Sequence, residues 1–105
     1  MEQEINVIDA RDLIREDEKT RKMQLLDVRS KEAFEESSIP GFMNIPLSEV
    51  SHKVPSLDGK KATLIICNDG SLSKKAQVLL EACGYKSTII RGGLNDWRAV
   101  INPDI

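Results

Sequence analysis

The stretch ATLIICNDGSLSKKAQVLLEACG, residues 62–84, predicts the fold class of this chain. Its first six residues, 62–67, are mostly apolar and rich in β-branched side chains, which is typical of a buried strand. After a short polar loop, apolar side chains recur at the spacing of one helix face: Leu72, Ala76, Leu79, Leu80 and Cys83. Gly84 follows where a glycine commonly ends a helix. A strand, a loop and an amphipathic helix in this order favour a parallel sheet.

The same alternation extends in both directions from this stretch. Four further short strands are expected: Ile5 with Val7, Gln24–Val28, Met43–Ile45 and Ser87–Ile90. Short helices are expected between the strands, with Asp9, Ser30 and Ser48 as their N-terminal caps. The aromatic side chains of Phe34 and Trp97 are expected in the core. The chain is therefore predicted to be an α/β protein with about five strands in a mainly parallel sheet and about five short helices.

Length and composition restrict the class of protein. The chain has 105 residues, 40% hydrophobic and 30% charged, which suits one domain spanning residues 1–105. Its net charge of −2, without clustered Lys and Arg, gives no nucleic-acid surface. No apolar run reaches the roughly 18 residues that span a membrane. The acidic start, Met1-Glu2-Gln3-Glu4, differs from a signal peptide, so a cytoplasmic location is expected.

The two cysteines and the single histidine restrict the chemistry. Cys67 and Cys83 are too few for a disulfide framework and too far apart for a zinc pair, so neither a metal nor another cofactor is expected. Cys83 lies on the apolar helix face and is expected to pack in the core. His52 lies in a polar stretch without any pattern of a Cys-His pair, and we expect it to be exposed.

A reactive cysteine is best placed at Cys67, at the tip of the strand with a helix N-terminus behind it. The thiolate is the nucleophilic form, and a helix N-terminus stabilises it. The loop residues that would surround the sulfur are Asn68, Asp69, Gly70, Ser71, Leu72 and Ser73. If their backbone N–H groups point inward, they bind an anion or a charged sulfur. A cysteine at this position is also commonly an inert buried side chain, and spacing alone leaves both interpretations open.

Four segments of the chain match, in order, the motifs of one protein family. LLDVR at 25–29 is similar to a DVR strand, and IPGFMNIPL at 39–47 is similar to a HIPGAINIPL segment. CNDGSLS at 67–73 is similar to an active-site loop, typically C-x-x-G-x-R-S, and RGGLNDW at 91–97 is similar to a closing GG-x-x-x-W. Together these segments resemble a rhodanese-like domain with its core at about residues 5–99.

The resemblance implies a fold and a reaction. The fold is a three-layer α/β/α arrangement with a five-stranded, mainly parallel sheet and short helices on both faces. The reaction is sulfur transfer, in which Cys67 takes a sulfane sulfur from thiosulfate or a persulfide donor and holds it as a persulfide. A thiol or cyanide then accepts that sulfur. The implied partners are a small sulfur donor or a persulfide-bearing protein, with no nucleic acid and no membrane.

Three positions depart from the family's pattern. Leu72 stands where an arginine or another cation is common, Asp69 adds a negative charge to the loop, and Ser38 replaces a histidine. Fewer cations and one more carboxylate disfavour a dianion, because charge-assisted hydrogen bonds are roughly twice as strong as neutral ones. We expect weak activity with thiosulfate and better activity with a donor of low charge.

Arg91, Asp27 and Arg29 are the charged candidates outside the loop. Arg91 follows the last strand at the same sheet edge as Cys67, so it is a candidate contact for an anion there, the alternative being a surface pair with a carboxylate. Asp27 and Arg29 are expected to be structural, with Glu32 or Glu35 as a partner.

Three functions remain open from the sequence. The first is a sulfurtransferase with Cys67 as the persulfide carrier. The alternative is a non-catalytic rhodanese-like binding or regulatory module, which the substitutions at Leu72 and Asp69 keep open. A thiol oxidoreductase is the weakest, since the chain has no C-x-x-C.

Overall fold

The computed structural model describes residues 3–105; Met1 and Glu2, which entered the argument about location, lie outside them. Five strands form one sheet: β1 (Glu4–Ile5), β2 (Met23–Asp27), β3 (Met43–Asn44), β4 (Ala62–Ile66) and β5 (Ser87–Ile90). The helices around it are α1 (Val7–Asp17), α2 (Lys31–Glu36), α3 (Leu47–Lys53), α4 (Ser71–Ala82) and α5 (Gly93–Val100), with a 3₁₀ turn, η1 (Val54–Ser56).

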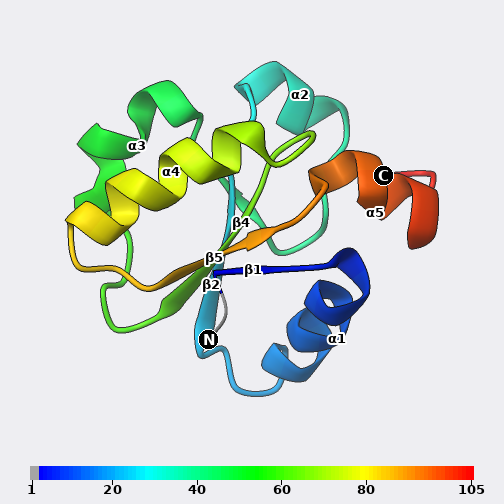
Figure 1. Ribbon diagram of the computed structural model, residues 1–105, viewed down its shortest axis with the longest axis horizontal. Coiled ribbons are helices and arrows are strands. Elements are labelled where there is room, and N and C mark those ends of the chain that lie inside the picture. Colours follow the sequence, from blue (N-terminus) through cyan, green and yellow to red (C-terminus); the bar gives the residue numbers. More distant parts are fainter. Residues whose placement is uncertain (1–2) are drawn as a thin grey trace.

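The sheet has the strand order β1-β5-β4-β2-β3, and all neighbouring strands are parallel. Helices α3 and α4 lie on one face, and α1 and α5 lie on the other (Figure 1). The arrangement has three layers, α/β/α, because each strand returns to the sheet through a helix that covers one of its faces. The predicted fold class is confirmed.

Two apolar cores fill the spaces between these layers. Val50 of α3, with Ala76 and Leu80 of α4, packs against Leu26 and Ile65 of the sheet. On the other face, α1 and α5 pack against the sheet residues Leu64, Ile66 and Ile90, and Trp97 of α5 is buried as predicted. Successive side chains of a strand point to opposite faces, so Cys67, two residues after Ile65, belongs to the α3 and α4 side.

Strand β4 lies in the middle of the sheet, between β5 and β2. It ends at Ile66, opposite Asp27, rather than at the predicted Cys67. The backbone hydrogen bonding between β2 and β4 nevertheless continues one step further, since the Val28 amide donates to the Ile66 carbonyl at 3.0 Å. Cys67 therefore leaves the sheet at its central carboxyl edge, where ligands gather in folds of this kind.

Three local predictions at the start of helices were wrong. Val7 lies in α1 rather than in the first strand, and Asn6, not Asp9, caps this helix by accepting a hydrogen bond from the Asp9 amide at 2.8 Å. Asparagine caps as well as aspartate does, and the residue pattern alone did not separate them. Helix α3 begins after Pro46 instead of at Ser48, because the carbonyl of Val28 accepts from the Leu47 amide at 3.1 Å.

The predicted buried face of α4 was rotated from the true one. The buried residues are Ser73, Ala76, Gln77 and Leu80, whereas Leu79 is 36% exposed. Cys83 is exposed as well, so its predicted place in the core was wrong. The Gln77 side-chain amide donates to the carbonyls of Gln3 and Ser87 at 2.9 and 3.2 Å. Because its polar group is paired, a glutamine takes a buried position that an apolar pattern assigns elsewhere.

The described residues also bear on membrane-spanning helices, metal sites and His52. Among residues 3–105, no helix is long and apolar enough to cross a membrane. In the same range, no three His, Cys, Asp or Glu side chains group together as a metal site. His52 is exposed in the last turn of α3, as predicted.

Candidate active site

The Cys67 sulfur lies inside a turn of backbone amides. The Gly70 amide donates to Sγ at 3.0 Å, and the Ser73 amide donates to it at 3.4 Å. Cys67 itself has an exposed fraction of 0%. These two donors belong to the end of the loop and the first turn of α4, where backbone N–H groups have no partner within the helix. The arrangement favours negative charge on the sulfur.

Gly70 makes this turn possible. It has a φ of +99°, a left-handed conformation that side chains other than glycine rarely adopt, and it immediately precedes α4. The reversal brings the start of α4 back over the end of β4. This is why the first amides of the helix, rather than solvent, surround the sulfur.

The N-terminus of α5 supports the loop from the other side. The Leu94 amide donates to the Cys67 carbonyl at 2.8 Å, and the Asn95 amide donates to the Asn68 carbonyl at 2.9 Å. A Cβ atom on Gly93 would lie 2.3 Å from that Cys67 oxygen, so only glycine fits there. Gly93 therefore allows the two backbones to meet.

The Asp69 side chain is exposed and bonds to Ser71. Its Oδ1 accepts from the Ser71 amide at 2.9 Å and from the Ser71 hydroxyl at 2.7 Å. The backbone hydrogen bond from Ser71, followed by the side-chain one, lowers the pKa of Asp69 below its ordinary value. The carboxylate is therefore ionised at neutral pH and places a full negative charge at the outside of the loop.

The remaining loop residues differ in exposure. Asn68 and Ser71 are exposed, whereas Leu72 is half-buried and packs against the core cluster that contains Cys67. Ser73 is completely buried. Of the residues predicted for the site, Cys67 and the six that follow it are brought together as one turn.

Arg91 lies outside this turn. Its Nη1 is 3.7 Å from Oε1 of Glu4, and both side chains are about half exposed. This is the surface pair that stood as the alternative to an anion contact. The contact with an anion stays a prediction.

Asp27 and Arg29 pair with each other rather than with Glu32 or Glu35, as had been expected. The Arg29 Nη2 and Asp27 Oδ2 atoms are 2.9 Å apart, and the two side chains are 3% and 1% exposed. The guanidinium also donates to the Ser37 carbonyl at 2.7 Å. The pair holds the end of β2, which lies next to Cys67, in one conformation.

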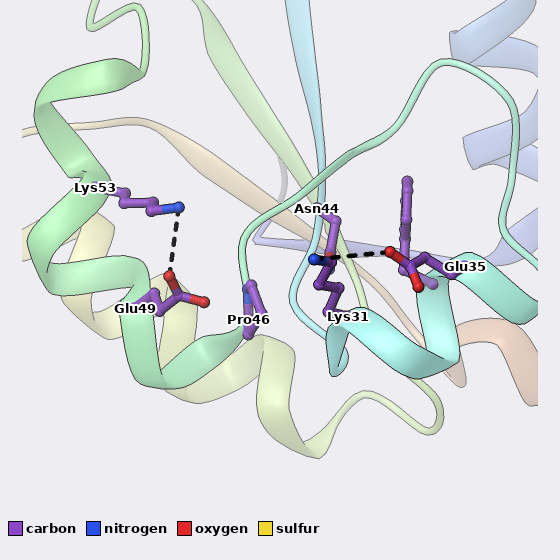
Figure 2. A pocket seen from close by; sticks show the side chains of 7 residues that line it. Lys31, Glu35, Asn44, Pro46, Glu49 and Lys53 are labelled. Atoms are coloured by element: carbon purple, nitrogen blue, oxygen red, sulfur yellow. Dashed lines mark ion pairs between the residues drawn. The ribbon is translucent and has the colours of Figure 1, made fainter.

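A surface pocket of about 600 Å³ lies between α2 and α3, lined by Lys31, Phe34, Glu35, Asn44, Pro46, Glu49 and Lys53. Figure 2 shows that its charged side chains pair within their own helices, Lys53 with Glu49 at 3.3 Å and Lys31 with Glu35 at 3.9 Å. None of the loop residues lines this pocket. The loop at Cys67 thus lies outside this pocket.

Comparison with known proteins identifies the family to which this site belongs. The sequence model of the rhodanese-like domain matches residues 6–100. The chain belongs to the rhodanese-like domain family. A rhodanese-related protein from Thermoplasma volcanium superposes with a TM-score of 0.80 at 29% identity, over 91% of this chain and 90% of that one.

Two relatives come from Bacillus subtilis. The putative sulfur carrier protein YrkF is 36% identical over 76 residues, which are 71% of this chain and 41% of YrkF. The putative sulfurtransferase YtwF is 29% identical over 86 residues, which are 82% of this chain and 84% of YtwF. The rhodanese-like chain thus spans less than half of the first relative and most of the second.

Proposed function

We propose that this rhodanese-like chain is a sulfurtransferase that carries a sulfane sulfur on Cys67. The observation that carries the proposal is the pair of amides, from Gly70 and Ser73, that donate to Sγ at 3.0 and 3.4 Å. Such donors stabilise a thiolate without a general base, which agrees with a chain that has one exposed histidine. The name of YtwF, a putative sulfurtransferase, points to the same class of activity.

The reaction consists of two displacements at sulfur. In the first, the Cys67 thiolate attacks the outer sulfur of thiosulfate or of a persulfide, the S–S bond of the donor breaks, and sulfite or a thiolate leaves with the electron pair. In the second, a thiolate or cyanide attacks the outer sulfur of the Cys67 persulfide. The electron pair of that S–S bond returns to Sγ, so no oxidant or reductant is consumed.

A donor of low charge suits the loop better than thiosulfate. The ionised Asp69 repels a dianion, and Leu72 contributes apolar surface instead of a cation. We propose a persulfide, carried by a small thiol or by another protein, as the preferred donor. YrkF is named as a putative sulfur carrier protein, which supports transfer between proteins. The chemistry needs reduced thiols, and we propose the cytoplasm, testable by cell fractionation.

The buried sulfur has a consequence for access. Because Cys67 has no exposed surface, a donor reaches Sγ only when the loop opens. The exposed Asn68 and Asp69 form the outer part of this loop, and the hydrogen bonds from α5 hold its inner part. We propose that the exposed side chains of Asn68 and Asp69 move aside for the donor, while the Gly70 and Ser73 amides stay at the sulfur.

The same burial favours a second function, a rhodanese-like binding or regulatory module without catalysis. In that case the sulfur is a packed side chain, as a free cysteine in a core commonly is. The two functions differ in whether Cys67 accepts a sulfur atom.

Mass measurement of the intact protein separates them. The protein, carrying Cys83→Ser so that one thiol remains, is incubated with thiosulfate or with cysteine persulfide, which carries less negative charge, and weighed. We expect a gain of one sulfur atom that cyanide removes, with more complete loading from the persulfide. Cys67→Ser, with Cys83 intact, is the matched control and should gain none that cyanide removes. No gain from either donor would contradict the sulfurtransferase and favour the binding module.

A further inference from the structure

Two buried side-chain oxygens in residues 3–105 have no hydrogen-bond partner, and one of them lies in the candidate active site. They are Oγ of Ser73, in the first turn of α4, and Oγ of Ser87, at the start of β5. Ser73 is 0% exposed, so water does not compensate for the missing bond. Buried hydroxyls in folded proteins are nearly always paired, and an exception calls for a physical reason.

The position of Ser73 supplies a physical reason for its missing partner. Its amide already donates to the Cys67 sulfur at 3.4 Å, and its Oγ is three bonds from that nitrogen. A hydroxyl group on such a short side chain moves among three staggered positions by rotation about one bond. Sulfur in a thiol is a weak acceptor, whereas a thiolate is a charged one, and a charged partner roughly doubles the strength of a hydrogen bond.

Ser87 lacks this relation to the sulfur. It pairs in register with Thr63, near the amino end of β4, whereas Cys67 follows the carboxyl end. The two unpaired hydroxyls therefore lie at opposite ends of the sheet. Ser87 provides a control for the effect of an unpaired buried hydroxyl as such.

We propose that the hydroxyl group of Ser73 donates a hydrogen bond to the Cys67 sulfur whenever that sulfur carries charge. The part of this proposal that concerns discharge of the persulfide rests on the sulfurtransferase function. Charge is present on Sγ twice: in the attacking thiolate, and again when an acceptor takes the outer sulfur and the electron pair of the S–S bond returns to Sγ. The proton stays on Ser73 throughout, and the hydroxyl lacks a partner while the thiol is neutral.

The test compares Ser73→Ala, Ser73→Thr and Ser87→Ala in the Cys83→Ser protein. The rate of Cys67 alkylation by iodoacetamide is measured across pH, together with the single-turnover rate at which cyanide discharges a preformed persulfide. Ser73→Ala should slow both steps by about tenfold, the ratio expected for one charge-assisted hydrogen bond, and should move the alkylation profile to higher pH. Ser73→Thr should restore both, and Ser87→Ala should change neither.

The melting temperature distinguishes this role from a structural one. Ser73→Ala removes no hydrogen bond of the resting protein, so it should melt at the same temperature or higher. Equal rates in Ser73→Ala and the parent, or an equal slowing in Ser87→Ala, would overturn the proposal. If Ser73→Ala unfolds, Ser73→Val against Ser73→Thr gives the same comparison at nearly equal shape. If the parent forms no persulfide, the sulfurtransferase proposal fails while the alkylation rates still decide the role of Ser73.

Discussion

Single residues at the loop set the charge that a sulfur donor meets. Asp69 is held ionised by its bonds to Ser71, which keep its pKa below the ordinary value of 3.8. Because the folded pKa is the lower one, the stabilisation from this carboxylate is fully present above pH 3.8 and is lost as pH falls through the folded pKa. At neutral pH the loop thus always presents this negative charge.

Opposite changes are therefore expected from two substitutions in a steady-state assay with thiosulfate and cyanide. Asp69→Asn keeps an acceptor for the Ser71 amide and removes the charge, so the Michaelis constant for thiosulfate should fall by about threefold. Arg91→Ala removes the proposed anion contact and should raise that constant by a similar factor. Glu4→Gln removes one negative charge and the surface partner of Arg91, so it should lower the Michaelis constant.

The salt dependence of the Michaelis constants tests whether charge causes these differences. Since exposed charges are screened within about 10 Å at 0.1 M salt, both differences should shrink in 0.5 M NaCl. An unchanged Michaelis constant in Arg91→Ala would end its role as an anion contact and leave it as the surface partner of Glu4.

At the scale of elements, the candidate site depends on two helix starts meeting at one strand end. Gly70, just before α4, and Ser73, in its first turn, donate their amides to the sulfur, and α5 supplies amides to the carbonyls of Cys67 and Asn68. The contact between α5 and the loop has no room for a side chain at Gly93, which has a φ of +57°. The position of the loop is therefore set by close backbone packing as well as by its own residues.

Two glycines of similar backbone conformation isolate the effect of that packing. Gly84, after α4, has a φ of +84°, and a Cβ there would meet nothing within 4 Å. Gly84→Ala should destabilise the fold by about 1–2 kcal/mol, the cost of a left-handed side-chain-bearing residue. Gly93→Ala adds a collision with the Cys67 carbonyl and should cost about 3 kcal/mol or more in urea unfolding.

The loading of Cys67 with sulfur should differ between the two glycine variants in the same way. Gly84→Ala should load Cys67 as the parent does, whereas Gly93→Ala should load it poorly even where it remains folded. Equal loss of stability and equal loading in the two variants would show that the α5 contact does not position the loop.

For the whole molecule, a partly buried polar network joins the sheet to α5 at the carboxyl edge of the sheet. The Asp27–Arg29 pair extends to the Ser37 carbonyl, and the Ser37 hydroxyl accepts from Arg98 of α5 at 3.0 Å. Asn44 of β3 donates to the carbonyls of both Asp27 and Arg29. One network thus connects β2, β3 and α5 at the carboxyl edge of the sheet.

Breaking the pair on one side should destabilise the protein strongly. Arg29→Met leaves the Asp27 carboxylate buried and unpaired, and we expect a loss of about 3–5 kcal/mol in urea unfolding. Glu35→Gln, in the exposed Lys31 pair, is the control and should cost about 0.5 kcal/mol or less. Recovery of most of the stability in the double variant Asp27→Leu, Arg29→Met would identify the unpaired charge as the cause. A small effect of Arg29→Met alone would contradict it.

The sequence by itself determined the element types, the fold class and the loop at Cys67. These follow from short-range rules: apolar runs of five or six residues form strands, and apolar residues three and four apart form helix faces. The stretch at 62–84 contains both patterns, so it predicted the strand, the loop and the helix in order, although the strand ends one residue earlier and the helix buries a different face. The family motifs placed the remaining segments in order.

Only the tertiary structure decided which side chains meet. It paired Asp27 with Arg29, rotated the buried face of α4 away from Cys83, and placed Gly93 against the Cys67 carbonyl. The Gly93 contact and the exposure of Cys83 depend on how the helices pack, whereas Asp27 and Arg29 are two residues apart and pair where the fold buries both side chains. A buried polar group usually finds a partner in the fold, as the Gln77 amide does. The Ser73 hydroxyl is buried without one. Local patterns carry no information about that partner, because it comes from another element of the fold.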